Sequence, residues 1–221
     1  MKSLSNGRVA CAALAAAVLG LGVASSAGAS GTPWITRTTA KASASTSTSP
    51  ASLAPGFFYV YDNLGPGNAY FCCAGWTVAG PSSSPGLAVS AMSFIPSRDA
   101  EVTQIDLALG NAGGFNGALI QLAGDNGGIP GTALGTWPVH GQPAFGGCCG
   151  LTTVHTRAIP VGAGRTYWVV AIAGNSDTWD AWNDNTTGAT GGDFYDGTWY
   201  QYGDATGAFD VIGCGKICRV A

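Results

Sequence analysis

Residues 101–131 constrain the fold most, because alternating apolar and polar side chains are interrupted there by turn residues. Four side chains of the first part share one face of an extended chain: Thr103, Ile105, Leu107 and Leu109. A period of two residues is typical of a β-strand with one buried face. A glycine- and asparagine-rich turn follows at 110–117, residues 118–123 alternate again, and a second turn ends the stretch. The pattern predicts a β-hairpin with a turn-rich tail.

The rest of the chain also favours short strands over helices. Only 10% of the 221 residues are charged and 35 are glycine, whereas about 25% of an average soluble protein is charged. About a dozen short apolar or alternating segments are separated by Gly, Pro, Asn and Asp, which predicts a β-sandwich or barrel. Residues 165–173 are apolar on both faces, so we expect them to form a central strand.

The first 29 residues are typical of a secretory signal peptide. Lys2 and Arg8 make the start basic, residues 9–23 form an apolar run, and Ala27-Gly28-Ala29 fits a cleavage site. The apolar run is shorter than the roughly 20 residues that a membrane span needs. We therefore expect a secreted, extracellular protein without membrane insertion.

The mature chain is expected to have three parts. Residues 30–56 are rich in Ser, Thr, Ala and Pro, which predicts a disordered, flexible linker. Residues 57–213 form a single all-β domain, long enough to bury a core. Residues 214–221 form a short tail clipped by a disulfide.

The expected domain is acidic. Residues 57–213 contain three basic residues, Arg98, Arg157 and Arg165, against all twelve acidic ones, a net charge of −9. Nucleic-acid binding needs a basic surface. A nucleic-acid partner is therefore disfavoured, and so is an anionic membrane.

Six cysteines remain after signal cleavage: Cys72, Cys73, Cys148, Cys149, Cys214 and Cys218. An even number in an exported chain predicts disulfides. We favour a local Cys214–Cys218 clip. Neighbours on a strand point to opposite faces, so either one cross-link joins the two adjacent pairs or each pair forms a vicinal disulfide. A metal site is a weaker alternative, because adjacent cysteines lack the usual C-x₂-C spacing.

Residues 175–202 hold the best candidate binding surface, because tryptophans and tyrosines alternate with Asp and Asn. Aromatic faces bind the apolar side of a sugar ring, and carboxylates and amides bind its hydroxyls. The alternative is that the tryptophans pack the core and the Asp and Asn residues form turns. The candidate ligand residues are Trp179, Asp180, Trp182, Asn183, Asp184, Tyr195 and Trp199.

Calcium is a second hypothesis. Asp125, Asn126, Asp184 and Asp193 offer the oxygen ligands that Ca²⁺ prefers, although no twelve-residue EF-hand loop is present. The alternative is that these carboxylates are solvated turn residues. No other cofactor is expected.

Nothing in the sequence indicates a catalytic site. The domain has eleven Asp and one Glu, Glu101, and no pattern marks two carboxylates as opposed across a glycosidic bond. His140 and His155 lack the spacing of a zinc-protease motif, and no nucleophile elbow or phosphate loop occurs. We therefore expect a protein that is not an enzyme.

Four segments, residues 115–139, 143–154, 162–191 and 207–213, together resemble the choice-of-anchor domain family (R type) of bacterial secreted proteins. The resemblance covers residues 61–213 and implies an extracellular or surface β-sandwich of jelly-roll type, with no established activity or catalytic residues. Family members often carry a PEP-CTERM-like sorting tail. Residues 214–221 replace that tail here, which favours release from the cell.

These observations predict a secreted, non-catalytic structural or interaction domain, extracellular or associated with the cell surface. The alternative is a carbohydrate-binding module that uses residues 175–202, and a secreted hydrolase is the less favoured third reading. The expected partners are extracellular polysaccharides or surface proteins.

Overall fold

The protein is all-β in the computed structural model, which describes residues 8–10 and 53–215. Fourteen strands make up the described chain, in agreement with the alternation and the frequent turn residues of the sequence. Their bounds are β1 (Arg8–Ala10), β2 (Phe57–Asp62), β3 (Phe71–Ala79), β4 (Val89–Phe94), β5 (Ala100–Leu107), β6 (Leu109–Gly113), β7 (Gly117–Asp125), β8 (Pro130–His140), β9 (Thr152–Val161), β10 (Tyr167–Ala173), β11 (Trp179–Asp184), β12 (Thr190–Tyr195), β13 (Trp199–Ala205) and β14 (Phe209–Cys214).

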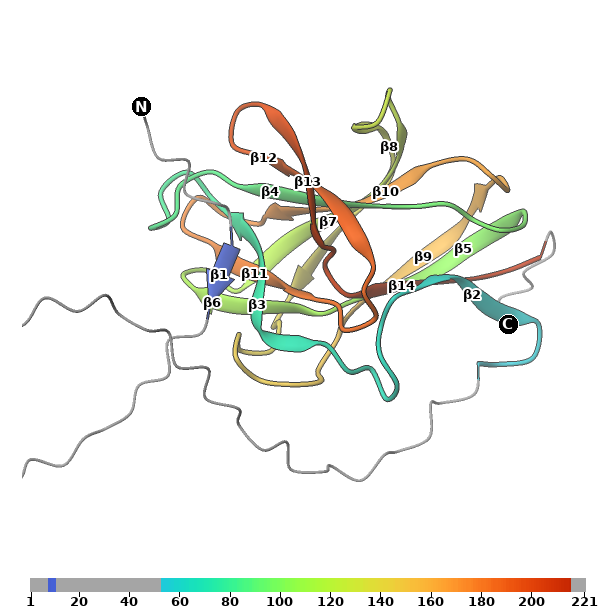
Figure 1. Cartoon of the computed structure of the whole chain (residues 1–221), viewed down its shortest axis with the longest axis horizontal. Coiled ribbons are helices and arrows are strands. Elements are labelled where there is room, and N and C mark those ends of the chain that lie inside the picture. Colours follow the sequence, from blue (N-terminus) through green and yellow to red (C-terminus); the bar gives the residue numbers. More distant parts are fainter. Residues whose placement is uncertain (1–7, 11–52, 216–221) are drawn as a thin grey trace, which may run out of the picture.

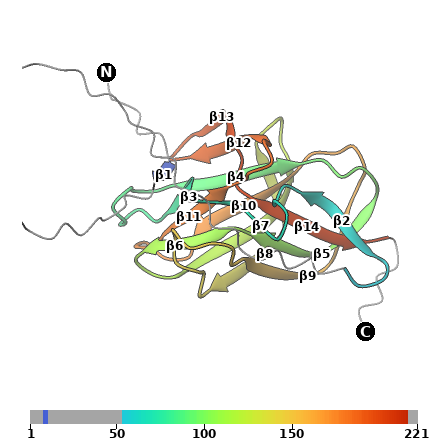
Figure 2. The same ribbon diagram turned by 60° about the horizontal axis from the view of Figure 1, so that its bottom comes forward.

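The strands form two layers packed face to face (Figures 1 and 2). One layer is a six-stranded sheet in the order β13-β12-β4-β10-β7-β8. The other contains two shorter sheets, β1-β3-β11-β6 and β2-β14-β5-β9. Only Ala108 separates β5 from β6, so these two strands join the shorter sheets into one layer.

The strand order is that of a jelly roll. When β5 and β6 are counted as one strand, one layer contains β3-β11-β5/β6-β9 and the other contains β4-β10-β7-β8. Successive strands of this set therefore alternate between the two layers, except β7 and β8, which form a hairpin within one layer, as in a double Greek key. All strand pairs are antiparallel. The prediction of an antiparallel β-sandwich of jelly-roll type is confirmed.

The predicted hairpin over residues 101–131 is wrong. β5 pairs with β9 and β14, and β6 pairs with β11, whereas β7 pairs with β10 and β8 in the opposite layer. The inward face was predicted well, because Ile105, Leu107 and Leu109 are all fully buried. The turn between the two strands crosses from one layer to the other instead of reversing the chain within a sheet.

The main core lies between the two layers. It includes Met92, Val169, Trp182 and Phe209, all buried and drawn from both layers. β10 lies inside the six-stranded sheet, between β4 and β7, which confirms that residues 165–173 contain a central strand.

The expected signal peptide and linker lie outside the described residues, apart from Arg8–Ala10 and residues 53–56. The part of the chain that the structure describes contains no helix that could span a membrane.

Candidate functional site

Trp182, the centre of the predicted sugar-binding surface, lies in the core. Its exposed fraction is 0%, its indole packs edge-on against Phe209 with ring centroids 5.6 Å apart, and Nε1 donates to the Ala208 carbonyl at 2.9 Å. The prediction that Trp182 lines a ligand site is therefore wrong. The physical reason is that β11 lies between β3 and β6 and is buried along almost its whole length.

The polar residues of β11 are buried as well. Asp180 accepts hydrogen bonds from Asn111 Nδ2 at 2.8 Å and Gln142 Nε2 at 3.3 Å, and burial raises its pKa to about 7. Asn183 Nδ2 donates to the Ala108 carbonyl at 2.7 Å, and Asp184 is also buried. Asp180 and Asn183 thus tie β11 to neighbouring strands and loops, and all three predicted ligand residues are buried.

Trp179 is only half-buried, but it packs against the main core. Its Nε1 is buried and has no hydrogen-bond partner among the described residues. Tyr195 and Trp199, the other predicted ligand residues, belong to the six-stranded sheet. The structure thus places the seven candidate residues in two layers and does not unite them in one surface.

Tyr195 and Trp199 instead form part of a second apolar cluster, the outer aromatic cluster. It contains Trp168 from β10, Tyr195 from β12 and Trp199 from β13, with the aliphatic residues Val89, Ala91, Ala123, Val170 and Ile172. Alternation along β10 explains it: Tyr167, Val169 and Ala171 belong to the main core, and the residues between them belong to this cluster. The cluster therefore lies on the side of the sheet that faces away from the core.

The side chains of the outer aromatic cluster range from buried to partly exposed. Trp168 is 4% exposed, and its Nε1 donates to Asp125 Oδ1 at 2.8 Å. Tyr195 and Trp199 are half-buried and face each other across the β12–β13 pair, with ring centroids 5.3 Å apart. The two rings therefore offer aromatic surface at the margin of the cluster.

The buried carboxylate of Asp193 lies on the same face of the sheet as the outer aromatic cluster. Asp193 is 2% exposed, and its Oδ2 has no hydrogen-bond partner among the described residues. Burial, and then the charge of Asp125, raise the pKa of Asp193 to about 6. Across the strand pair from Asp193 lies Gln201, an exposed amide.

Two hairpins meet above this face. Gln201 Nε2 in the β12–β13 hairpin donates to the Gly128 carbonyl at 2.5 Å, and Gly128 lies in the turn between β7 and β8. Both hairpins rise above β4 and β10 in Figure 1. Because β13 and β7 are four positions apart in the sheet order, the sheet must curl strongly for this contact to form. The contact joins the hairpin that carries Asp193 and Gln201 to the turn that follows Asp125, on the side of the sheet that carries the aromatic rings.

The calcium candidates are only partly brought together. Asp125 and Asp193 are close enough for one charge to affect the other, whereas Asp184 lies in the other layer. Asp125 also accepts from the Gly128 amide at 3.2 Å, and the Asn126 amide donates to the Ile129 carbonyl, both within one turn. The described residues contain no group of three or more His, Cys, Asp or Glu that could hold a metal ion.

The predicted vicinal disulfide occurs in one of the two adjacent cysteine pairs. Cys148 and Cys149 form a vicinal disulfide, as one alternative predicted. The Sγ atoms of Cys72 and Cys73 lie 3.6 Å apart, within hydrogen-bond distance, and form no disulfide with each other. Cys214 is disulfide-bonded, and Cys218, its predicted partner, lies outside the described residues.

Three aspartates form a row on the outer side of the other layer, which the sequence did not reveal. Asp210 on β14 lies directly opposite Asp62 on β2 and Asp106 on β5. Asp210 is 4% exposed, and burial, followed by the charges of Asp106 and Asp62, raises its pKa to about 8. Asp106 accepts from Gln104 Nε2 at 2.6 Å and from Thr153 Oγ1 at 2.5 Å. Burial and the neighbouring charges therefore favour the protonated form of Asp210.

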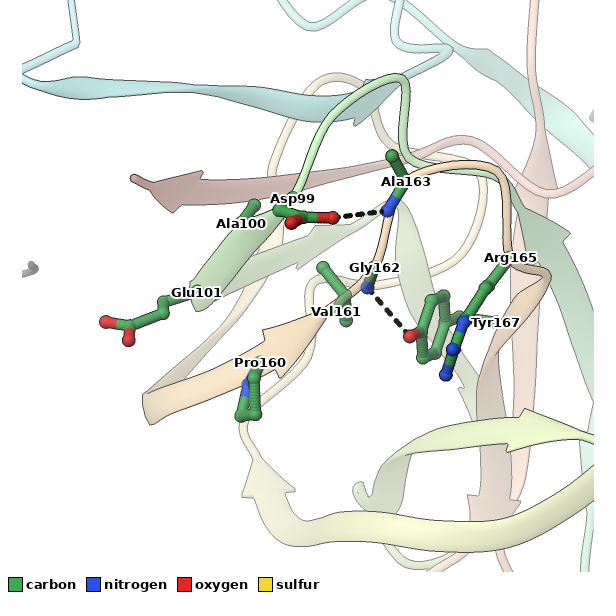
Figure 3. Close-up of a pocket in the computed structure, with 9 residues that line it drawn as sticks. All are labelled: Asp99, Ala100, Glu101, Pro160, Val161, Gly162, Ala163, Arg165 and Tyr167. Atoms are coloured by element: carbon green, nitrogen blue, oxygen red, sulfur yellow. Dashed lines mark hydrogen bonds between the residues drawn. The ribbon is translucent and has the colours of Figure 1, made fainter. Parts of the chain in front are cut away.

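A hollow of about 590 Å³ lies at the end of the sandwich, where β5 begins and β9 ends (Figure 3). Asp99 Oδ1 accepts from the Ala163 amide at 3.0 Å, and Tyr167 Oη accepts from the Gly162 amide at 2.8 Å. The Arg165 side chain extends beside the Tyr167 ring in Figure 3. The bonds of Asp99 and Tyr167 stabilise the loop between β9 and β10, so we assign them a structural role.

Two comparisons with known proteins give no match: no protein-family model matches the sequence, and no curated protein matches it significantly. The resemblance to the choice-of-anchor family therefore remains an expectation drawn from the motifs.

Proposed function

We propose that this protein is a secreted, non-catalytic interaction domain that binds carbohydrate on the outer face of its six-stranded sheet. The observation that carries the proposal is the outer aromatic cluster beside Asp125, Asp193 and Gln201. This is the carbohydrate-binding alternative, moved from β11 to a different surface.

The cluster lies outside the main core between the two layers. Each sheet of a β-sandwich must be apolar on the face that packs against the other sheet, and its other face is commonly solvated and polar. Here the solvent side of the six-stranded sheet carries Trp168, Tyr195 and Trp199. An aromatic surface outside the main core is a candidate for recognition.

The surrounding groups suit a sugar better than an apolar ligand. Aromatic rings contact the C–H face of a pyranose, while carboxylates and amides bond to its hydroxyls. Asp193 Oδ2 lies without a partner in the described chain, and the exposed Gln201 lies across the strand pair from it. Neutral polysaccharides fit best, because the acidic domain repels anionic polymers.

The aspartate row does not have the spacing of a glycosidase pair. A glycosidase keeps its two carboxyl groups about 5 Å or more apart, which leaves room for the sugar or a water. Asp106 and Asp210 are instead directly opposed and share a hydrogen bond. Secretion is supported by the signal-like first 29 residues and by the disulfides in the chain.

The test is co-sedimentation of the purified protein with a panel of insoluble polysaccharides, including cellulose, chitin, xylan and β-1,3-glucan. We expect retention on at least one neutral polymer. Trp199→Ala should weaken that binding at least tenfold, about 1.4 kcal/mol, because it removes one of the two partly exposed rings.

Tyr200→Ala is the matched control. Tyr200 is the next residue on β13, is 38% exposed, and lies opposite Phe194, a residue of the main core. It therefore lies on the other face of the same hairpin, and its removal should leave retention unchanged. Failure of the wild type to bind any polymer, or equal losses in both variants, would overturn the proposal.

A further inference from the structure

One edge of the sandwich accepts a strand from a distant part of the sequence. β1 pairs antiparallel with the outer edge of β3, with Arg8 opposite Trp76, Val9 opposite Gly75 and Ala10 opposite Ala74. Figure 1 shows this short strand beside β3 at the margin of its sheet. On its other side β3 pairs with β11. Without β1, β3 would be the outermost strand of the sheet.

β3 lacks the charged residues and prolines that often protect an edge strand. Its nine residues, FCCAGWTVA, contain no charged residue and no proline. Natural edge strands are commonly guarded by charges, prolines or irregularities, because their unpaired backbone groups can pair with another chain. Most of the other outermost strands carry such guards, namely Pro130 and Pro138 in β8, Arg157 and Pro160 in β9, Asp204 in β13 and Asp62 in β2. β6 carries neither a charge nor a proline, but a bridge between Asn111 and Ala144 covers part of it.

The pairing of β3 with β11 is irregular next to this edge. The β3–β11 register shifts between Asn183 and Asp184, whose partners are Gly75 and Phe71. Residues 72–74 therefore have no opposite residue on β11, and the strand bulges there. Phe71, next to the bulge, is 53% exposed and offers an apolar contact for an added strand.

We propose that the edge of β3 at Ala74–Trp76 is a strand-addition site for an extended segment of a partner protein. Arg8–Ala10 belongs to the expected signal peptide, so its removal would vacate the edge in the secreted protein. Added strands bind through main-chain hydrogen bonds, which tolerate many sequences. The preferred segment is uncharged or basic, because the segment seated there contains Arg8 and the domain is acidic. This site is separate from the outer aromatic cluster.

The test uses the full chain and a synthetic peptide of residues 5–12 with serine in place of Cys11. The double substitution Val9→Pro and Ala10→Pro removes two amide donors from β1 and should vacate the edge. Fluorescence anisotropy should detect peptide binding to this vacated chain, and hydrogen exchange at residues 74–76 should slow when the peptide binds. The wild type should bind at least tenfold more weakly, because its own strand competes at a high effective concentration.

Adding Ala74→Pro to the vacated chain is the blocking control. Residue 74 has no partner on β11, so the proline should abolish peptide binding and leave the fold intact, as checked by circular dichroism. The proposal is overturned if the vacated, folded chain does not bind the peptide, or if Ala74→Pro leaves the affinity unchanged. A vacated chain that dimerises and resists the peptide would also overturn it, because the occupant would then be a second copy. Polysaccharide retention should be the same in all these variants, so failure here is distinguishable from failure of the proposed function.

Discussion

Two tryptophans of one sequence segment have opposite surroundings. Trp182 lies fully buried between the layers, whereas Trp199 is half-buried on the outer face of the six-stranded sheet. Residue type alone therefore does not identify a recognition surface, and the strand's position in its sheet decides the role. The same holds for aspartate: Asp180 is hydrogen-bonded inside the fold, and Asp193 lies beside aromatic rings on its outer side.

Trp182→Ala should lower the free energy of unfolding by about 3–5 kcal/mol, because it leaves a cavity and removes the hydrogen bond to Ala208. Urea denaturation followed by circular dichroism measures the change. Trp199→Ala, the comparison, should cost about 1 kcal/mol, since that ring is only half-buried. Equal costs for the two substitutions would contradict the different burial that we describe.

The sequence pattern showed which residues of β11 alternate, but it did not show that both faces of this strand are buried. β11 is buried on both faces, so aspartate and tryptophan at alternate positions gave no guide to exposure. Trp168 was expected to lie in a central strand, and it does. Its role in the outer aromatic cluster could not be foreseen, because the cluster depends on residues from β12, β13 and β4. The aspartate row was missed for the same reason, since its members come from three strands.

At the scale of elements, β5 and β6 act as one strand that joins the two shorter sheets. Its alternation predicted the buried face correctly, but the following turn was taken for a hairpin turn. A turn rich in glycine and asparagine reverses the chain equally well within a sheet or between two layers. Strand pairing is a long-range property, which explains why the strands were predictable and their partners were not.

Because β3 and β11 approach each other closely at position 75, only glycine fits there without a shift of the backbone. A Cβ atom at this position would lie 2.4 Å from the Trp182 carbonyl oxygen, so Gly75→Ala must displace the backbone of β11. We expect a loss of about 1–3 kcal/mol of unfolding free energy, measured by urea denaturation. Gly113→Ala on β6 is the matched control in the same sheet, because the nearest contact of its Cβ would be 3.7 Å. A Gly75→Ala protein as stable as the Gly113→Ala protein would show that β3 and β11 are less closely paired.

At the scale of the whole molecule, buried carboxyl groups make the fold sensitive to alkaline pH. Burial raises the pKa to about 6 for Asp193, about 7 for Asp180 and about 8 for Asp210. Each group holds its proton more tightly in the folded state than in the unfolded state. The resulting stabilisation is fully present below pH about 4 and is lost as the pH rises through these values.

We therefore predict that the unfolding free energy is lower at pH 9 than at pH 5, by more than about 1.4 kcal/mol, which corresponds to one pKa unit on one carboxyl group. Urea denaturation at the two pH values measures it. Asp210→Asn should reduce the difference, because the amide stays neutral, whereas Asp177→Asn, at an exposed loop position, should not. Stability that is unchanged or higher at pH 9 would contradict the raised pKa values.

The two layers give the molecule two different outer faces, one aromatic and one with the aspartate row. The central claim is that the aromatic face binds carbohydrate. The most direct measurement is hydrogen exchange of the full chain with and without a soluble oligosaccharide of the polymer that retains it. We predict slower exchange in β12, β13 and the turn between β7 and β8, and no change in β2, β14 or β5. Slower exchange confined to β2, β14 and β5 would place the ligand on the aspartate row and contradict the account.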